Sequence, residues 1–147
     1  MTARFQRANF VVRDLARALT FYRDVVGFEV SSMKGHNPHS YSFSVFEIPR
    51  DVSIGFCVLS LPDQPRVMAL TEIQSSLIAA TPRPRRGAVV LEVTDIDAVV
   101  EGARKLGLHV YEEAELVSTS GRRGREVGIV DFDDNLLVIY KLADSAQ

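Results

Sequence analysis

The sequence predicts an α+β fold built from two tandem βαβββ modules. A pattern of strand, Asp, amphipathic helix, Gly and strand occurs twice, with equivalent positions 81 residues apart up to the helix and 80 residues apart after it. One residue is therefore missing late in the second helix. The 147 residues are 46% hydrophobic and 24% charged, the balance of a soluble globular domain. Two copies are too few for a solenoid, so the chain is a duplicated module.

The first copy begins with a half-buried strand over residues 7–12. Its alternation places Ala8, Phe10 and Val12 on one face and Arg7, Asn9 and Val11 on the other. Asp14 follows as the expected helix N-cap, and Gly27 as the left-handed residue that ends the helix. Residues 28–33, 41–48 and 52–60 are predicted to form three further strands.

The second copy repeats this order. A strand with Val89, Leu91 and Val93 on its inner face leads to the capping residue Asp95, and Gly107 ends the helix. Further strands are expected near residues 108–112, 126–130 and 136–141. Each sheet would cover one face with its own helix, and the two remaining faces would enclose a cleft.

The two modules are joined by a proline-rich segment. We predict module one over residues 4–61, a connector over 62–86 and module two over 87–142, within a single domain of residues 1–147. The connector has prolines near both ends and is expected to hold a short helix between residues 67 and 80.

Composition excludes several classes of protein. The formal net charge of −2 and the pI of about 5.9 argue against nucleic-acid binding. The single cysteine, Cys57, cannot form an intramolecular disulfide, which fits a reducing compartment. No apolar stretch approaches the ~20 residues that a membrane span needs, and the N-terminus has no signal-peptide pattern. The expected location is the cytoplasm, without a membrane partner.

Two segments resemble a known family. The stretch Val12–Glu29, with Asp-Leu, Phe-Tyr and Gly-Phe at its characteristic positions, and the turn Asp131–Asn135 are similar to the vicinal oxygen chelate superfamily. That superfamily includes glyoxalase I, bleomycin-resistance proteins, fosfomycin-resistance proteins and extradiol dioxygenases. The resemblance implies paired βαβββ modules around a cleft. It also implies, for most of the enzymes, a divalent metal ion held in that cleft.

The positions that hold the metal in those enzymes carry other residues here. The resemblance places Arg7 and Ala88 at the first-strand positions, Val138 on the last strand, and Cys57 or Gly55 at the remaining position. Arginine stays protonated and has no free lone pair, and alanine and valine have no donor atom. We therefore expect no metal and no cofactor, as in the bleomycin-resistance proteins, which bind a drug without catalysis.

The candidate ligand-binding residues are Arg7, Asn9, Cys57, Glu92 and Tyr140. Strand parity places Arg7, Asn9, Glu92 and Tyr140 on the cleft side. Glu92 suits a cationic or hydroxyl-bearing ligand, and it is also the candidate general base if the protein is an enzyme. Arg7 suits a carboxylate or phosphate, but it would equally pair with Glu92 across the two modules.

Metal-independent binding of a small organic ligand is the leading hypothesis. The first alternative is a lyase, isomerase or dioxygenase-like enzyme that uses Glu92, or a non-standard metal set drawn from His36, His39 and Glu47. The second is an interaction domain with a filled cleft. We expect a homodimer, because a short chain with uncovered sheet faces and edges gains by association. The arginine clusters at 83–86 and 122–125 are expected to be solvated loops that guide an anionic ligand.

Overall fold

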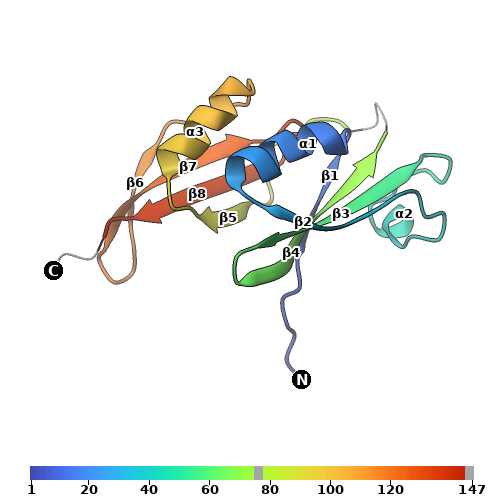
Figure 1. Ribbon diagram of the computed structural model, residues 1–147, viewed down its shortest axis with the longest axis horizontal. Helices are drawn as coiled ribbons and strands as arrows, with labels where there is room; N and C mark the ends of the chain where they lie inside the picture. Colours follow the sequence, from blue (N-terminus) through green and yellow to red (C-terminus); the bar gives the residue numbers. More distant parts are fainter. Residues whose placement is uncertain (75–77, 145–147) are drawn as a thin grey trace. The chain divides into compact units, whose positions relative to one another are not determined.

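A computed structural model describes residues 1–74 and 78–144 of the chain. The chain divides into two compact units, Met1–Ala79 and Ala80–Gln147. Each unit contains one four-stranded sheet (Figure 1). The α+β class and the duplicated βαβββ modules that the sequence predicts are confirmed.

The first unit forms one sheet with its strands in the order β1-β4-β3-β2, in which β1 and β4 are parallel and the other pairs antiparallel. Its elements are β1 (Ala8–Val12), α1 (Leu15–Phe21), η1 (Tyr22–Val26), β2 (Glu29–Lys34), α2 (Ser42–Val45), β3 (Ile54–Leu61) and β4 (Gln64–Ile73).

The second unit repeats this topology with the strand order β5-β8-β7-β6, and β5 and β8 are parallel. Its elements are β5 (Val89–Glu92), α3 (Ile96–Lys105), β6 (Ala114–Val117), β7 (Arg123–Val130) and β8 (Leu136–Leu142). In Figure 1, α3 lies over one face of this sheet. No helix in the described part of the chain is long and apolar enough to cross a membrane.

Both predicted helix caps are confirmed. The Asp14 carboxylate accepts a hydrogen bond from the Arg17 N–H at 3.0 Å, and Asp95 accepts from the Ala98 N–H at 3.0 Å. Gly27 and Gly107 follow the helices with φ of +102° and +76°, a region that favours glycine. The extra residue of the first copy is held in η1, a π-helical turn that has no counterpart among residues 80–144 of the second unit.

The predicted strand over residues 41–48 is wrong. This segment contains the single helical turn α2 instead, and its Phe43 is buried in a small core cluster with Ile48, Ile54 and Ile73. The alternation of polar and apolar residues indicated a strand, but no neighbouring strand pairs with it among the described residues. The turn places Phe43 inward and leaves Tyr41 76% exposed.

The connector predicted over residues 62–86 is also wrong in its first half. Residues 64–73 form β4, a strand at the centre of the first sheet, where a short helix was expected. Met68, Ala69, Leu70 and Thr71 are all buried, because β4 is covered on both faces. A strand of this kind is a continuous apolar run without the period of two, which does not distinguish it from a helix.

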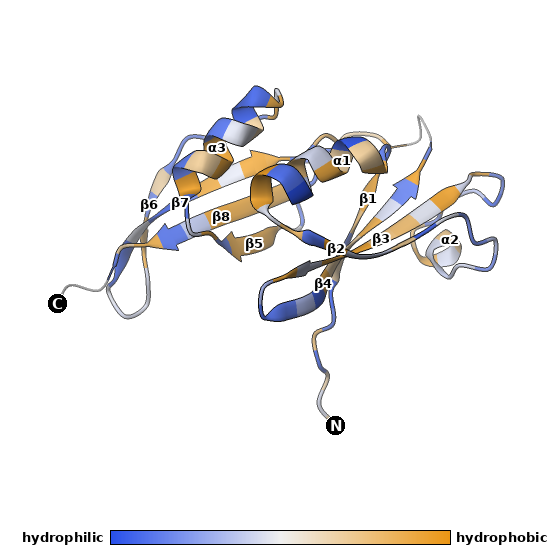
Figure 2. Cartoon of the chain, in the orientation of Figure 1, coloured by the Kyte–Doolittle hydropathy of each residue, from blue (hydrophilic) through white to orange (hydrophobic). Residues whose placement is uncertain are grey.

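Strand pairing defines two faces in each sheet. In the first sheet, Phe10, Leu70 and Cys57 are register partners and share the face that lies under α1. In the second sheet, Leu91, Ile139 and Val127 are the equivalent partners under α3. Figure 2 shows that the inner strands β3 and β8 carry mainly hydrophobic residues. The opposite face of each sheet carries the candidate residues Asn9, Glu92 and Tyr140.

Candidate functional site

Three polar side chains form a row across the open face of the second sheet. Glu92 of β5 is the register partner of Tyr140 of β8, and Tyr140 is in turn the partner of Glu126 of β7. Side chains that are direct partners in neighbouring strands have Cβ atoms about 4.5–5.5 Å apart. Tyr140 therefore lies in register between two glutamates. Sequence analysis identified Glu92 and Tyr140 but not Glu126, because the register that brings β7 beside β8 is not visible in the sequence.

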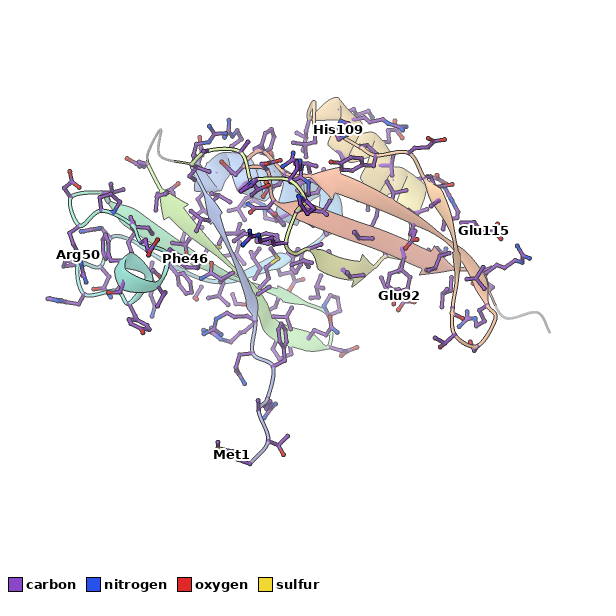
Figure 3. All side chains as sticks on the ribbon, turned by 180° about the vertical axis from the view of Figure 1, so that it is seen from behind. Met1, Phe46, Arg50, Glu92, His109 and Glu115 are labelled. Atoms are coloured by element: carbon purple, nitrogen blue, oxygen red, sulfur yellow. The ribbon has the colours of Figure 1, made fainter. Side chains whose placement is uncertain are left out.

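The acidic row is accessible to a ligand. Glu92 is exposed, and Tyr140 and Glu126 are half-buried. In Figure 3, Glu92 lies on the side of the second sheet that faces away from α3. Val90 and Val138, partners in the adjacent row of the same face, supply an apolar surface next to the carboxylates, and Val90 is 61% exposed. The face thus combines negative charge, an aromatic ring and apolar contact area.

The first sheet carries a different set of side chains on its corresponding face. The Thr71 hydroxyl, only 1% exposed, donates to the Asn9 side-chain oxygen at 3.0 Å. Arg7 precedes β1 and is exposed. Asn9 is thus bonded to a buried hydroxyl on β4, a contact that the sequence analysis missed together with the strand. Arg7 and Glu92 belong to different units, and a pair between them stays a prediction.

Cys57 lies on the opposite face from Asn9. Its register partner Leu70 is also the partner of Phe10, so the thiol points toward α1 and is fully buried. Burial raises the pKa of the Cys57 thiol. The expectation that Cys57 lines the ligand side of the sheet is therefore corrected. The first-module equivalent of Val138 is Ala69 on β4, since Leu70 and Ile139 pair equivalently with Phe10 and Leu91.

These residues do not fit the metal site that the enzymes of the resembled superfamily use. The equivalent positions hold Arg7, Ala69, Ala88 and Val138, none of which offers a ligand atom to a divalent ion. Within residues 1–74 and 78–144, no group of three or more His, Cys, Asp or Glu side chains is arranged to hold a metal.

The non-standard set of His36, His39 and Glu47 does not form a metal site either. His36 Nδ1 accepts a hydrogen bond from the Ile54 N–H at 3.1 Å, which occupies that lone pair with a structural contact. His39 and Glu47 are exposed in the same loop region. The loop containing α2 uses His36 to bind the start of β3.

The arginine clusters are more structured than expected. Arg85 Nη2 donates to Asp134 at 2.7 Å, and Arg83 Nη1 donates to the same carboxylate at 3.2 Å. In the second cluster, Arg125 binds Asp97 at 2.7 Å and Glu113 at 2.6 Å. Arg83 and Arg125 are 55% and 43% exposed, as expected of solvated positions, whereas Arg85 is only 13% exposed. The expectation of a loop is corrected for Arg123 and Arg125, which belong to β7.

Comparison with known proteins places this geometry in a family. The family model of the glyoxalase/bleomycin resistance protein/dioxygenase superfamily matches residues 4–139. No curated protein matches the sequence.

Solved structures share the fold at low sequence identity. A glyoxalase family protein from Bacillus cereus is 18% identical, with a TM-score of 0.73 and coverage of 97% of this chain and 95% of that one. Glyoxalase I from Leishmania major is 19% identical, with a TM-score of 0.64 and coverage of 95% and 87%. A variant of the fosfomycin resistance protein FosX from Listeria monocytogenes, solved with Mn(II), is 14% identical, with a TM-score of 0.62 and coverage of 98% and 96%.

Proposed function

Because this chain belongs to the glyoxalase/bleomycin resistance protein/dioxygenase superfamily, we propose that it binds a small organic ligand without a metal ion. The binding surface is the open face of the second sheet. The row Glu92–Tyr140–Glu126 supports this proposal most directly, because it places two carboxylates on either side of an accessible aromatic ring. The noncatalytic drug-binding members of the superfamily are the nearest functional comparison.

The chemistry of the row favours a cationic ligand. A cation over the face of a tyrosine ring gains about 0.5–2 kcal/mol, depending on how far it is desolvated. Glu92 and Glu126 add Coulomb attraction from both sides of the ring. Val90 and Val138 offer contact to an apolar substituent on the same ligand. The ligand class is thus an organic cation with an apolar or aromatic body.

The proposal that no metal is needed rests on the side chains at the metal-ligand positions. Ala69, Ala88 and Val138 have hydrocarbon side chains at the positions where the superfamily's enzymes supply imidazole or carboxylate. Dialysed protein is expected to carry no stoichiometric metal and to show no rise in melting temperature with Mn²⁺ or Zn²⁺. About one ion per chain retained through dialysis would contradict this part of the proposal.

Titration with benzyltrimethylammonium tests the ligand class, because this probe combines a quaternary ammonium charge with an aromatic group. A simple metal cation has the charge but not the aromatic group. Isothermal titration calorimetry should show binding that weakens about threefold or more in Glu92→Gln and in Glu126→Gln, since each removes one charge beside Tyr140. Glu112→Gln, an exposed glutamate outside the row, is the matched control and should bind as the wild type does. Equal affinity in all four proteins would refute the assignment of the site.

Catalysis is the second candidate, because two carboxylates beside a phenol are also a proton-transfer set. A binding protein returns its ligand unchanged, whereas an enzyme converts it. Mass spectrometry of ligands recovered after incubation separates these cases. Turnover that is lost in Glu92→Gln while binding is retained would establish Glu92 as a general base.

A further inference from the structure

The internal repeat allows one surface hollow to be compared with its own duplicate. In each unit a hollow lies beside the helix, on the face of the sheet that the helix covers. The hollow of the first unit has a volume of about 440 Å³ and that of the second about 210 Å³. Four lining positions correspond through the offsets of 81 and 80: Ala16 with Asp97, Leu19 with Val100, Arg23 with Arg104, and Met33 with Glu113.

In the second unit an arginine occupies part of the equivalent space. Arg125 extends from β7 and binds Asp97 of α3 and Glu113 through its guanidinium group. Its register partner on β8 is Lys141, whose ammonium group donates to the Thr94 carbonyl at 2.8 Å. Both charges on the sheet side are therefore cations, and each has a partner within the unit.

In the first unit the arginine and both of its acidic partners are absent. Register pairing places Gly55 of β3 opposite Glu72 of β4, which are the equivalents of Arg125 and Lys141. Ala16 and Met33 replace the two carboxylates that bind Arg125. The space that an arginine side chain occupies in one module is thus empty in the other, and the charge beside it is reversed from lysine to glutamate.

Glu72 is half-buried, and among residues 1–74 and 78–144 only one of its two carboxylate oxygens has a hydrogen-bond partner. Its Oε2 accepts a hydrogen bond from the Leu15 N–H at 2.6 Å, which holds the carboxylate at the start of α1. Within the described part of the chain, no arginine or lysine forms an ion pair with it. Arg23, which also lines the hollow, is already paired with Asp24, its Nε lying 2.8 Å from the Asp24 carboxylate. Among the described residues, the hollow therefore presents one carboxylate without an ion-pair partner, next to the apolar side chains of Leu15, Leu19 and Met33.

We propose that this hollow binds a small primary amine, whose ammonium group donates to Glu72 Oε1 and whose apolar body contacts Leu19 and Met33. The ligand occupies the place that the Arg125 side chain fills in the second module. A volume of about 440 Å³ falls within the range of small-molecule sites. This site lies under the helix of the first unit and is separate from the acidic row of the second sheet, so it goes beyond the proposed function.

Phenethylammonium is the probe, and phenethyl alcohol, of nearly the same shape but uncharged, is its control. The full-length protein should bind the amine at least about tenfold more tightly than the alcohol, because a hydrogen bond to a charged partner accounts for that ratio or more. In a ¹H–¹⁵N spectrum the Leu15 amide, which donates to Glu72, should shift with the amine. Equal affinity for the two probes, or an unmoved Leu15 amide, would overturn the proposal.

Two variants and one control variant locate the site. Glu72→Gln keeps an acceptor for the Leu15 N–H but removes the charge, and should abolish the preference for the amine over the alcohol. Glu29→Gln is the same change at an exposed position of β2 in the same unit, and it should leave the preference for the amine unchanged. Gly55→Arg introduces the side chain of the second module and should prevent amine binding by filling the hollow.

The outcomes separate this site from the acidic row. If Glu92→Gln loses amine binding and Glu72→Gln does not, the proposal that the hollow binds the amine is overturned. The same result would support the proposed function. The reverse pattern would support the hollow alone. A thermal melt of Glu72→Gln close to that of the wild type shows that its binding result does not reflect unfolding.

Discussion

The contact between Arg85 and Asp134 should stabilise the second unit measurably. Asp134 lies in the turn before β8, with a φ of +66°, and its carboxylate accepts from the Thr81 N–H at 2.6 Å and the Thr81 hydroxyl at 2.8 Å. Arg83 and Arg85 add two ion pairs. This turn therefore binds the segment that leads into β5.

The magnitude follows from the exposure of each pair. The Arg85 and Asp134 side chains are 13% and 19% exposed, so their charge-assisted hydrogen bond is worth about 1.5–3 kcal/mol. Arg83 is 55% exposed, and its pair with Asp134 adds less than about 1 kcal/mol. Asp134→Asn should lower the free energy of unfolding by about 2–3 kcal/mol at pH 7. Asparagine tolerates a positive φ, so backbone strain does not contribute.

The pH dependence gives a second check. The hydrogen bonds from Arg83, Arg85 and Thr81 hold the pKa of Asp134 well below its usual range. A lowered folded-state pKa means that the stabilisation is present above the unfolded value of about 3.9 and is lost as the pH falls below it. The difference between wild type and Asp134→Asn should therefore be constant from pH 5 to 7 and shrink below about pH 4.

Urea unfolding followed by circular dichroism measures both quantities. Asp63→Asn, the same substitution at an exposed residue that also has a positive φ (+61°), is the matched control and should change stability little. A loss below about 0.5 kcal/mol in Asp134→Asn, or a difference that does not change with pH, would refute the assignment of a stabilising role to this carboxylate.

Three further outcomes are expected. Cys57 should react slowly with an aromatic disulfide reagent in the native protein and fully after unfolding, because the thiol is buried and its pKa is raised; fast native labelling would contradict this placement. Gly124→Ala should destabilise by about 1–3 kcal/mol in urea, since a Cβ there would lie 2.9 Å from Leu142 Cα, whereas Gly87→Ala, with open space around it, should not. Light scattering should report roughly twice the 16.3 kDa chain mass if the protein is the proposed homodimer, and a monomer at all concentrations would exclude it.

The sequence predicted the elements whose residues carry a local signal. Asp14 and Asp95 are confirmed as caps because a short acidic side chain before an amphipathic stripe has one dominant structural use. The two faces of β5 also follow from alternation, since one side of this edge strand lies under α3 and the other is open. Glu92 was therefore placed on the open face from the sequence alone.

The rest depended on contacts between distant segments. The strand β4 reads as a helix or a loop until it is seen buried between β1 and β3. Its omission also led to the wrong face for Cys57, because the position equivalent to Val138 was sought on β3. Glu126 joins the acidic row only through the pairing of β7 with β8, which no local pattern encodes. The internal repeat indicates β4, because β8 of the second copy needs an equivalent strand in the first copy.

The π-helical turn η1 shows how one copy of the module can be a residue longer than the other. One additional residue in an α-helix ordinarily rotates every later side chain by about 100° around the axis, which would move an apolar stripe away from its sheet. Here the wider turn over Tyr22–Val26 takes up the surplus residue locally, and the chain still leaves the helix through a glycine at the same structural position in both copies. Insertions and deletions at this point of the module are therefore compatible with an unchanged topology, and the two halves have been free to diverge in length as well as in sequence.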